Sequence, residues 1–190
     1  MCSAVQMAGR GPRQATMFFS VKELELRKAH FDVDLPPGQL DFSDNHLKQA
    51  GPLHASGDAE LVSLSLGEIR VKGSYSVVIE CDCDRCLEPA EFPIEKRFDL
   101  YYHPESSQST AGEVHLDEGE SEIGFYEGDG LELKDVLREQ VLLDLPMQRV
   151  CKPDCKGVCP YCGQNRNTTS CNCQAPPVDD RWNALKRLTQ

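Results

Sequence analysis

Cysteine is the residue type with the clearest chemical meaning in this sequence, because six of the ten cysteines fall between residues 151 and 173. Cys159 and Cys162 have the C-x-x-C spacing of a zinc knuckle, in which two thiolates bind one metal ion. Cys171 and Cys173 follow after a short loop and complete a set of four sulfur ligands. We call this predicted metal centre site one.

The remaining paired cysteines predict a second centre, site two. Cys83 and Cys86 form another C-x-x-C in the segment CDRCLEP, and Cys151 and Cys155 remain in the tail. Joined on one ion, they would fasten the tip of a hairpin to the segment after a helix. The alternative is that Cys83 and Cys86 are free thiols or a redox pair, with Arg85 lowering their pKa. The sequence thus predicts one or two zinc ions.

Other kinds of cysteine chemistry fit the sequence less well. Cys155, Cys159 and Cys162 also match the C-x-x-x-C-x-x-C of radical enzymes, but too few residues follow for the large barrel that such enzymes need. There is no nucleophile elbow, phosphate-binding loop or dinucleotide fingerprint. A metal closed by four thiolates is structural rather than catalytic. We therefore expect a protein that is not an enzyme and has no small-molecule substrate.

The expected compartment supports metal binding over disulfides. Residues 1–19 have no apolar segment before a cleavage site, as a secretory signal would require. No apolar run approaches the length needed to span a bilayer, so no membrane association is expected. We place the chain in the cytoplasm, where cysteines stay reduced.

Charge is distributed unevenly along the chain. The net charge is -11, yet residues 149–190 carry +4, which leaves -15 on the rest. We expect Lys152, Lys156 and Arg166 to contact RNA phosphates, and the acidic part to bind a basic ribosomal or assembly protein. Arg85, Arg149 and Lys152 are expected to surround the thiolates of site two.

The hydrophobic pattern predicts an α+β fold that positions these cysteines. Apolar residues alternate over 69–83, interrupted at Gly73, and again over 92–102, which predicts an antiparallel hairpin with a bend or bulge at Gly73. Helical spacing follows from Leu133, with Asp129 as the expected cap and Pro146 as the end. The prediction is an antiparallel β-rich body, one long helix, and a C-terminal zinc module that ends in a short helix.

The expected boundaries follow from the same patterns. Residues 1–16 are predicted to be a disordered extension, and a strand is expected to start at Met17. The body covers 17–150, with an acidic insert at 105–129 that contains one short strand, EIGFY, and the long helix at 131–145. The zinc module covers 151–190, where Trp182, Leu185 and Leu188 lie on one side of the terminal helix.

Three segments then resemble a known family. CDRCLEP, LREQVLLDLPMQRVC and CKPDCKGVCPYCGQNRNTTSCNC occur in this order, as in the YceD-like family, and the resemblance runs from about Met17 to the C-terminus. It implies a role in accumulation of large-subunit ribosomal RNA, and ribosomal RNA or a pre-ribosomal particle as partner. The central C-x-x-C of the family falls on Cys83 and Cys86. Its tail cysteines fall on Cys151, Cys155, Cys159, Cys162, Cys171 and Cys173.

Two functions follow. The first is a non-enzymatic zinc-binding factor that supports ribosome assembly by bridging ribosomal RNA and a ribosomal or assembly protein. The alternative is a thiol-based redox protein or regulator that uses Cys83 and Cys86. Acidic neighbours on both sides of this pair, and the lack of a thioredoxin-like pattern before it, favour the first.

Overall fold

The computed structural model describes residues 17–42, 47–63, 67–105 and 123–173. The chain forms two compact units, which we call the body unit and the cysteine unit. The body unit comprises Met1–Cys81 and Glu91–Met147, and the cysteine unit comprises Asp82–Ala90 and Gln148–Gln190. The turn between the two longest strands, Asp82–Ala90, thus belongs to the same compact unit as the C-terminal segment that starts at Gln148.

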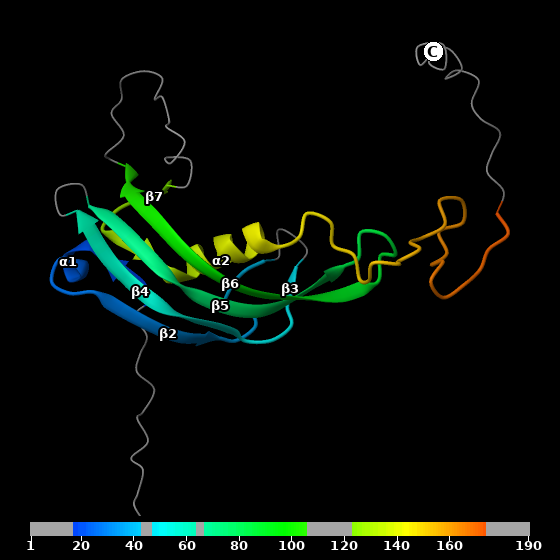
Figure 1. Cartoon of the computed structure of the whole chain (residues 1–190), viewed down its shortest axis with the longest axis horizontal. Coiled ribbons are helices and arrows are strands. Elements are labelled where there is room, and N and C mark those ends of the chain that lie inside the picture. Colours follow the sequence, from blue (N-terminus) through cyan, green and yellow to red (C-terminus); the bar gives the residue numbers. More distant parts are fainter. Residues whose placement is uncertain (1–16, 43–46, 64–66, 106–122, 174–190) are drawn as a thin grey trace, which may run out of the picture. The chain divides into compact units, whose positions relative to one another are not determined.

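The body unit is built mainly from strands (Figure 1). In the described part of the chain, a six-stranded sheet has the order β2-β4-β5-β6-β7, with β3 beside β5, and β1 pairs with β8 separately. The strands of the large sheet are β2 (Ala29–Leu35), β3 (Lys48–Gln49), β4 (Leu53–Ser63), β5 (Glu68–Asp82), β6 (Pro89–Pro104) and β7 (Ile123–Tyr126). The strands of the small sheet are β1 (Phe18–Ser20) and β8 (Gly130–Glu132).

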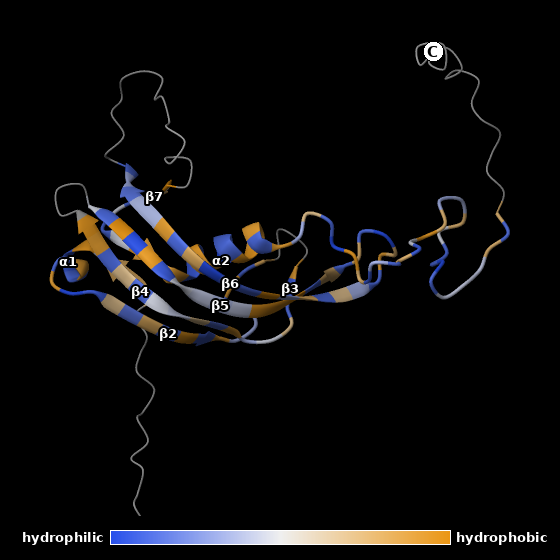
Figure 2. Cartoon of the chain, viewed as in Figure 1, coloured by the Kyte–Doolittle hydropathy of each residue, from blue (hydrophilic) through white to orange (hydrophobic). Residues whose placement is uncertain are grey.

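Period-two alternation produces the core of the body unit. Along β5 the apolar side chains alternate with more polar ones, as the colours of Figure 2 show. Ile69, Val71, Val77 and Ile79 are buried on one face of the sheet, and Cys81 follows them into the core. The expected pair of long strands is therefore confirmed as neighbouring β5 and β6.

Two glycines make room for an aromatic ring at the middle of the sheet. Gly57 of β4 lies opposite Gly73 of β5, and the ring of Phe31 packs over both. A Cβ on Gly57 would lie 2.7 Å from Cζ of Phe31. The expected bulge at Gly73 is not found in the pairing of β4 with β5, because the register passes through Gly73 unchanged; the register shift lies between Leu61 and Ser63.

Helix α2 (Leu133–Asp144) covers the apolar face of the sheet (Figure 1). It buries four apolar residues, Leu133, Val136, Leu137 and Val141. Its 12 residues are an average length, so the expectation of one long helix over 131–145 is not confirmed. Asp129 does not cap it: residues 130–132 are used by β8, and the Leu133 amide instead donates to the carbonyl of Met17 at 2.7 Å.

The start of the described chain differs from the expected single strand. Strand β1 ends at Ser20, and a short helix, α1 (Val21–Leu24), follows it. This helical turn allows both Phe19 and Leu24 to be buried in the core, which a continuous strand would not do. The extension 1–16, most of the acidic insert and the terminal helix fall outside the described residues. The expected strand in EIGFY is found as β7.

No helix in the described ranges is both long enough and apolar enough to cross a membrane.

Candidate metal centres

Eight cysteines gather into two clusters of four, each able to hold a metal ion. Both clusters lie within the cysteine unit, and their sulfur atoms lie within 4.8 Å of one another in each cluster. One cluster contains Cys159, Cys162, Cys171 and Cys173, the residues of site one. The other contains Cys83, Cys86, Cys151 and Cys155, the residues of site two. The structure thus brings together both predicted sets, whereas ligation itself stays a prediction.

Sulfur separations in site two match a shared metal and not a disulfide. The Sγ atoms of Cys83 and Cys155 are 3.9 Å apart, and those of Cys86 and Cys151 are 3.7 Å apart. Four thiolates bound to one tetrahedral ion at about 2.3 Å would be separated by about 3.8 Å. A disulfide would bring two sulfurs to about 2.05 Å.

Both C-x-x-C segments fold into the same turn. In site one, the Gly163 amide donates to the Cys159 carbonyl at 2.9 Å, and Gly163 has a φ of 75°. In site two, the Leu87 amide donates to the Cys83 carbonyl at 2.9 Å, and Leu87 has a φ of 61°. We call these turns the two knuckles. Each directs backbone amides at the first cysteine, where a metal-bound thiolate needs hydrogen-bond donors.

Backbone amides stabilise a thiolate at Cys83. Burial alone raises the pKa of the Cys83 thiol, but amides of Cys151, Cys86 and Arg85 donate to its sulfur and lower that pKa to about 6. The Cys151 amide lies 3.3 Å and the Arg85 amide 3.5 Å from this sulfur. This sulfur is therefore prepared to ionise and accept a metal.

Two thiols of site two, those of Cys86 and Cys151, show the opposite tendency, because their pKa values are raised, whereas the pKa of Cys155 is lowered like that of Cys83. Partial loss of water around the sulfur, followed by hydrogen bonding with Cys155, raises the pKa of Cys151 to about 12. Four negative sulfurs repel one another at this distance, so some of them keep their protons. A divalent cation would remove that repulsion and release those protons on binding.

Site one likewise contains one thiol with a lowered pKa and others with a raised pKa. Amides of Tyr161 and Cys162 donate to the Cys159 sulfur and lower the pKa of that thiol to about 6. Hydrogen bonding to Cys162, followed by partial loss of water around the sulfur, raises the pKa of Cys173 to about 12. Site one is the more open of the two, because Cys162 and Cys173 are exposed, whereas only Cys151 is exposed in site two.

The expected ring of cations around site two is only partly found. The Arg85 guanidinium donates to the carbonyl of Cys155 at 3.3 Å, so it supports the backbone of a ligand residue. Arg149 forms an ion pair with Asp84, at 3.3 Å between Nη2 and Oδ1, because a carboxylate offers it a stronger acceptor than a shared thiolate does. Backbone amides are the donors to Cys83.

The three candidate RNA-binding residues are all at least partly exposed in the cysteine unit. Lys152 and Lys156 flank Cys155, and Arg166 lies in the loop between Cys162 and Cys171. Their exposure leaves the charged groups accessible to a polyanion. Contact with RNA stays a prediction.

Sequence reasoning missed three residues that shape the sites. Leu87 takes the left-handed conformation that glycine provides in the other knuckle. Asn167 donates from Nδ2 to the Cys155 sulfur at 3.4 Å, and Asn165 accepts hydrogen bonds from Asn167. Only the clustering of asparagines after Gly163 could have indicated this role, since short amides commonly fix local turns.

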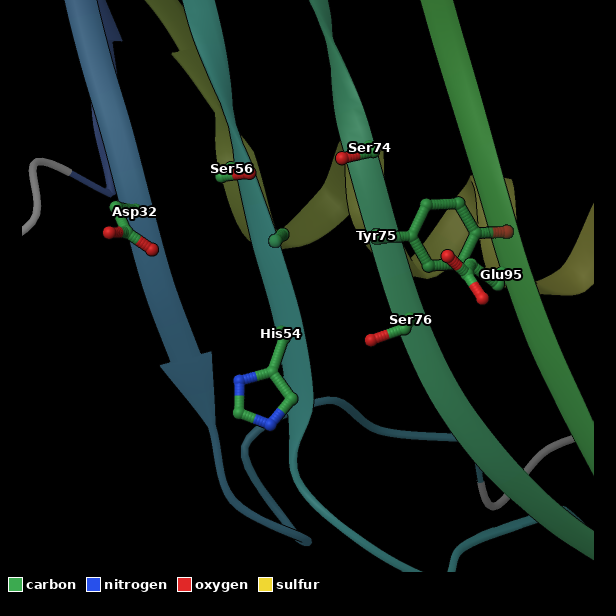
Figure 3. A pocket seen from close by; sticks show the side chains of 8 residues that line it. Asp32, His54, Ser56, Ser74, Tyr75, Ser76 and Glu95 are labelled. Atoms are coloured by element: carbon green, nitrogen blue, oxygen red, sulfur yellow. The ribbon is translucent and has the colours of Figure 1, made fainter.

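A separate hollow lies on the uncovered face of the large sheet, within the body unit (Figure 3). It is shallow, about 200 Å³, and its walls include the acidic side chains of Asp32 and Glu95. Small side chains, Ser56 and Ser74, line its floor, and His54 lies at its edge. We regard this hollow as a polar surface of the sheet.

Fold and sites together define a class: a small α+β protein with a strand-rich body and a separate unit carrying two four-cysteine centres. Residues 71–189 match the family described as "Large ribosomal RNA subunit accumulation protein YceD". This match covers more than half of the chain and includes all eight clustered cysteines. The chain therefore belongs to the YceD family.

Several proteins resemble this chain in sequence. A maize protein named "Large ribosomal RNA subunit accumulation protein YCED homolog 1, chloroplastic" is 28% identical over 75% of this chain and 55% of its own length. An uncharacterised protein of Mycobacterium tuberculosis is 31% identical over 69% of this chain and 60% of its own length. A Bacillus subtilis protein, YlbN, is 21% identical over 90% of this chain and 93% of its own length. The chain thus spans little more than half of the maize and mycobacterial relatives, and no solved structure matches it.

Proposed function

We propose that this protein is a non-enzymatic factor that supports large-subunit ribosomal RNA accumulation and ribosome assembly, with zinc in both cysteine sites. The observation that carries the proposal is the gathering of eight cysteines into two closed four-sulfur clusters in a member of the YceD family. Four sulfur ligands in tetrahedral reach favour zinc, and they leave no coordination position for a substrate. Zinc would therefore hold the fold of the cysteine unit and would take no part in a reaction.

Metal content tests the zinc part of the proposal. Protein purified without added metal should contain two zinc ions and no iron, measured by elemental analysis per chain. Cys83→Ser should remove one zinc and Cys162→Ser the other, whereas Cys81→Ser lies outside both clusters and should remove none. A chain with iron, or without bound metal, would contradict the proposal.

A cellular measurement tests the ribosomal part. In a strain that lacks the protein, the amount of mature large-subunit RNA should fall relative to small-subunit RNA. Wild-type protein should restore the ratio, and a variant with both Cys83→Ser and Cys162→Ser should not. An unchanged ratio in the deletion strain would remove the ribosomal assignment while leaving zinc binding intact.

We propose that the cysteine unit binds RNA phosphates through Lys152, Lys156 and Arg166. The accessibility of these three side chains and the +4 charge of residues 149–190 support this binding. Replacing all three with glutamine should weaken binding to large-subunit RNA and flatten its dependence on salt, by about 0.7 in the logarithmic slope for each phosphate that is no longer neutralised. Lys96→Gln, at an exposed lysine of β6, is the matched control and should leave the slope unchanged.

The protein partner we propose is a basic ribosomal or assembly protein bound by the acidic body. The -15 charge outside residues 149–190, and the acidic side chains beside the hollow, support a basic partner. Asp32→Asn with Glu95→Gln should weaken binding to purified basic large-subunit proteins, and added salt should weaken the wild type similarly. The bridge between RNA and protein would act in the cytoplasm, where the thiolates stay reduced.

A redox function is the second candidate, and one observation favours it. The lowered pKa of Cys83, about 6, would make this thiolate reactive. Against it, Cys83 is fully buried and shares its site with three other sulfurs. Alkylation distinguishes the two: zinc-loaded protein should resist iodoacetamide at Cys83, whereas a redox pair would react and would form a Cys83–Cys86 disulfide under mild oxidation.

A further inference from the structure

One hydrogen bond joins the two cysteine sites. Asn167 belongs to the loop between Cys162 and Cys171, and both of these cysteines are in site one. Its side-chain Nδ2 donates to the Sγ atom of Cys155, a member of site two, at 3.4 Å. The loop that site one would close therefore supplies a donor to a sulfur of the other site.

The side chain of Asn167 can point only one way. Its Oδ1 accepts the backbone amide of Lys156 at 2.9 Å, and an amide nitrogen can only donate. The other atom of the amide group must therefore be Nδ2, which carries two hydrogens. It donates one to the Cys155 sulfur and the other to Oδ1 of Asn165, at 2.9 Å. These contacts hold a donor against the sulfur whatever its protonation state.

Asn165 anchors this arrangement to the site-two knuckle. Nδ2 of Asn165 donates to Oε1 of Glu88 at 3.4 Å. Asn165 also forms a β-bridge with Val158, and the Val158 amide donates to the Arg85 carbonyl at 2.8 Å. Asn165 Oδ1 also accepts the Asn167 amide at 2.9 Å. The loop is thus built around the ligands of both sites.

We infer that Asn167 is a positioning residue that couples the two metal sites, so that metal in site one raises the affinity of site two. The inference rests on the proposed binding of metal at both clusters. Metal in site one would fix both ends of the loop and hold Asn167 against Cys155, where an amide donor stabilises a metal-bound thiolate. Reciprocity of binding free energies requires that metal in site two raises the affinity of site one by the same factor.

Asn167→Asp is the sharpest test, since it keeps the shape and the acceptor for the Lys156 amide but replaces the donor with an anionic oxygen. Zinc is withdrawn by a graded chelator series, and the freed thiols are alkylated and located by peptide mass spectrometry. Labelling of Cys83 and Cys86 reports site two, and labelling of Cys171 and Cys173 reports site one. We expect the zinc affinity of site two to fall about 10- to 100-fold in the variant, as for other hydrogen-bond partners of metal ligands.

Removing site one tests the coupling itself. In a Cys171→Ser, Cys173→Ser protein, site two should lose a similar factor of affinity even though all four of its own cysteines remain. Asn167→Asp should then add little, because an open loop no longer holds the donor in place. If Asn167→Asp lowered the zinc affinity of site two by the same factor with and without site one, the coupling would be overturned.

A matched control separates the coupling from general damage. Gln148→Glu makes the same change from amide to carboxylate at an exposed position of the cysteine unit outside both clusters, and should leave site two unchanged. If the wild type holds no metal, the proposed function fails. If it holds two ions and Asn167→Asp releases site two no earlier than the wild type, only the coupling fails.

Discussion

Leu87 and Gly163 occupy equivalent positions in the two knuckles, and both have left-handed backbones, with φ of 61° and 75°. Each donates its amide to the carbonyl of the cysteine four residues earlier, at 2.9 Å. Glycine adopts this conformation freely, whereas for a residue with a Cβ it costs about 1 kcal/mol. The turn of site two is therefore strained at Leu87, and the other contacts of that site must hold it.

Replacing Leu87 with glycine should tighten site two. Little apolar burial is removed, because Leu87 is 65% exposed, and the relief of about 1 kcal/mol corresponds to about a fivefold gain in zinc affinity. Chelator competition, read by alkylation of Cys83 and Cys86, measures it. Weaker binding in Leu87→Gly would show that the leucine side chain itself supports the site.

Gly163→Ala should have the opposite effect on site one. An added Cβ would meet no atom within 4 Å, so the cost comes from the backbone alone and is about 1 kcal/mol. Zinc should leave Cys171 and Cys173 at a lower chelator concentration, while site two changes only through its coupling to site one. The two substitutions thus measure the same backbone effect with opposite sign.

The glycine pair at the centre of the sheet should tolerate no side chain. Gly57→Ala would place a methyl group 2.7 Å from both Cζ of Phe31 and Cα of Gly73, and a backbone cannot move aside as a flexible side chain can. We expect a loss of about 2–3 kcal/mol in unfolding free energy, measured by urea denaturation of the full chain. Gly51→Ala, with nothing within 4 Å of its added Cβ, should change little.

Local chemistry explains what the sequence predicts well here. The alternation along β5 is long and regular, so the strand can be predicted from adjacent residues. Each C-x-x-C also places two cysteines close together through its own turn, so each pair can be predicted from its spacing. The partition of cysteines into two sets follows from counting pairs.

Non-local competition explains what the sequence does not predict. Asp129 looks like a helix cap, but pairing of β8 with β1 occupies the residues before α2 and delays its start to Leu133. Gly73 suggests a bulge, yet the pairing with β4 continues through it, and its lack of a side chain leaves room for the ring of Phe31 from β2. Leu87 has the wrong residue type for its conformation, and Asn167 acts on a cysteine 12 residues earlier. None of these can be read from a residue and its neighbours.

Loss of site one should loosen the tail and leave the body folded. Cys162→Ser removes one of four ligands, and a short segment with little apolar burial depends on its metal for folding, with about 10 kcal/mol of apparent binding energy in structural zinc sites. Amide exchange should accelerate over residues 156–173 and stay slow along β5. Unchanged protection in the tail would show that site one does not hold that fold.

High pH should destabilise the body unit through Tyr75. This side chain is buried, which raises its pKa well above the ordinary value, and its hydroxyl donates to Oδ2 of Asp144 at 2.6 Å, which raises the pKa further. An unfolded tyrosine loses its proton near pH 10, whereas folded Tyr75 keeps it. The stabilisation is therefore complete below about pH 10 and is lost as pH rises, by up to about 1.4 kcal/mol per pH unit.

Tyr75→Phe tests this dependence directly. At neutral pH the variant should lose about 1–2 kcal/mol, because a charge-assisted hydrogen bond between β5 and α2 disappears. Between pH 9 and 11 its urea midpoint, followed by far-UV circular dichroism, should fall less steeply than that of the wild type. Some slope should remain, since burial also raises the pKa of Tyr102. Tyr161→Phe, at a half-exposed ring of the cysteine unit, is the matched control; an equal flattening there would show that Tyr75 is not the titrating group.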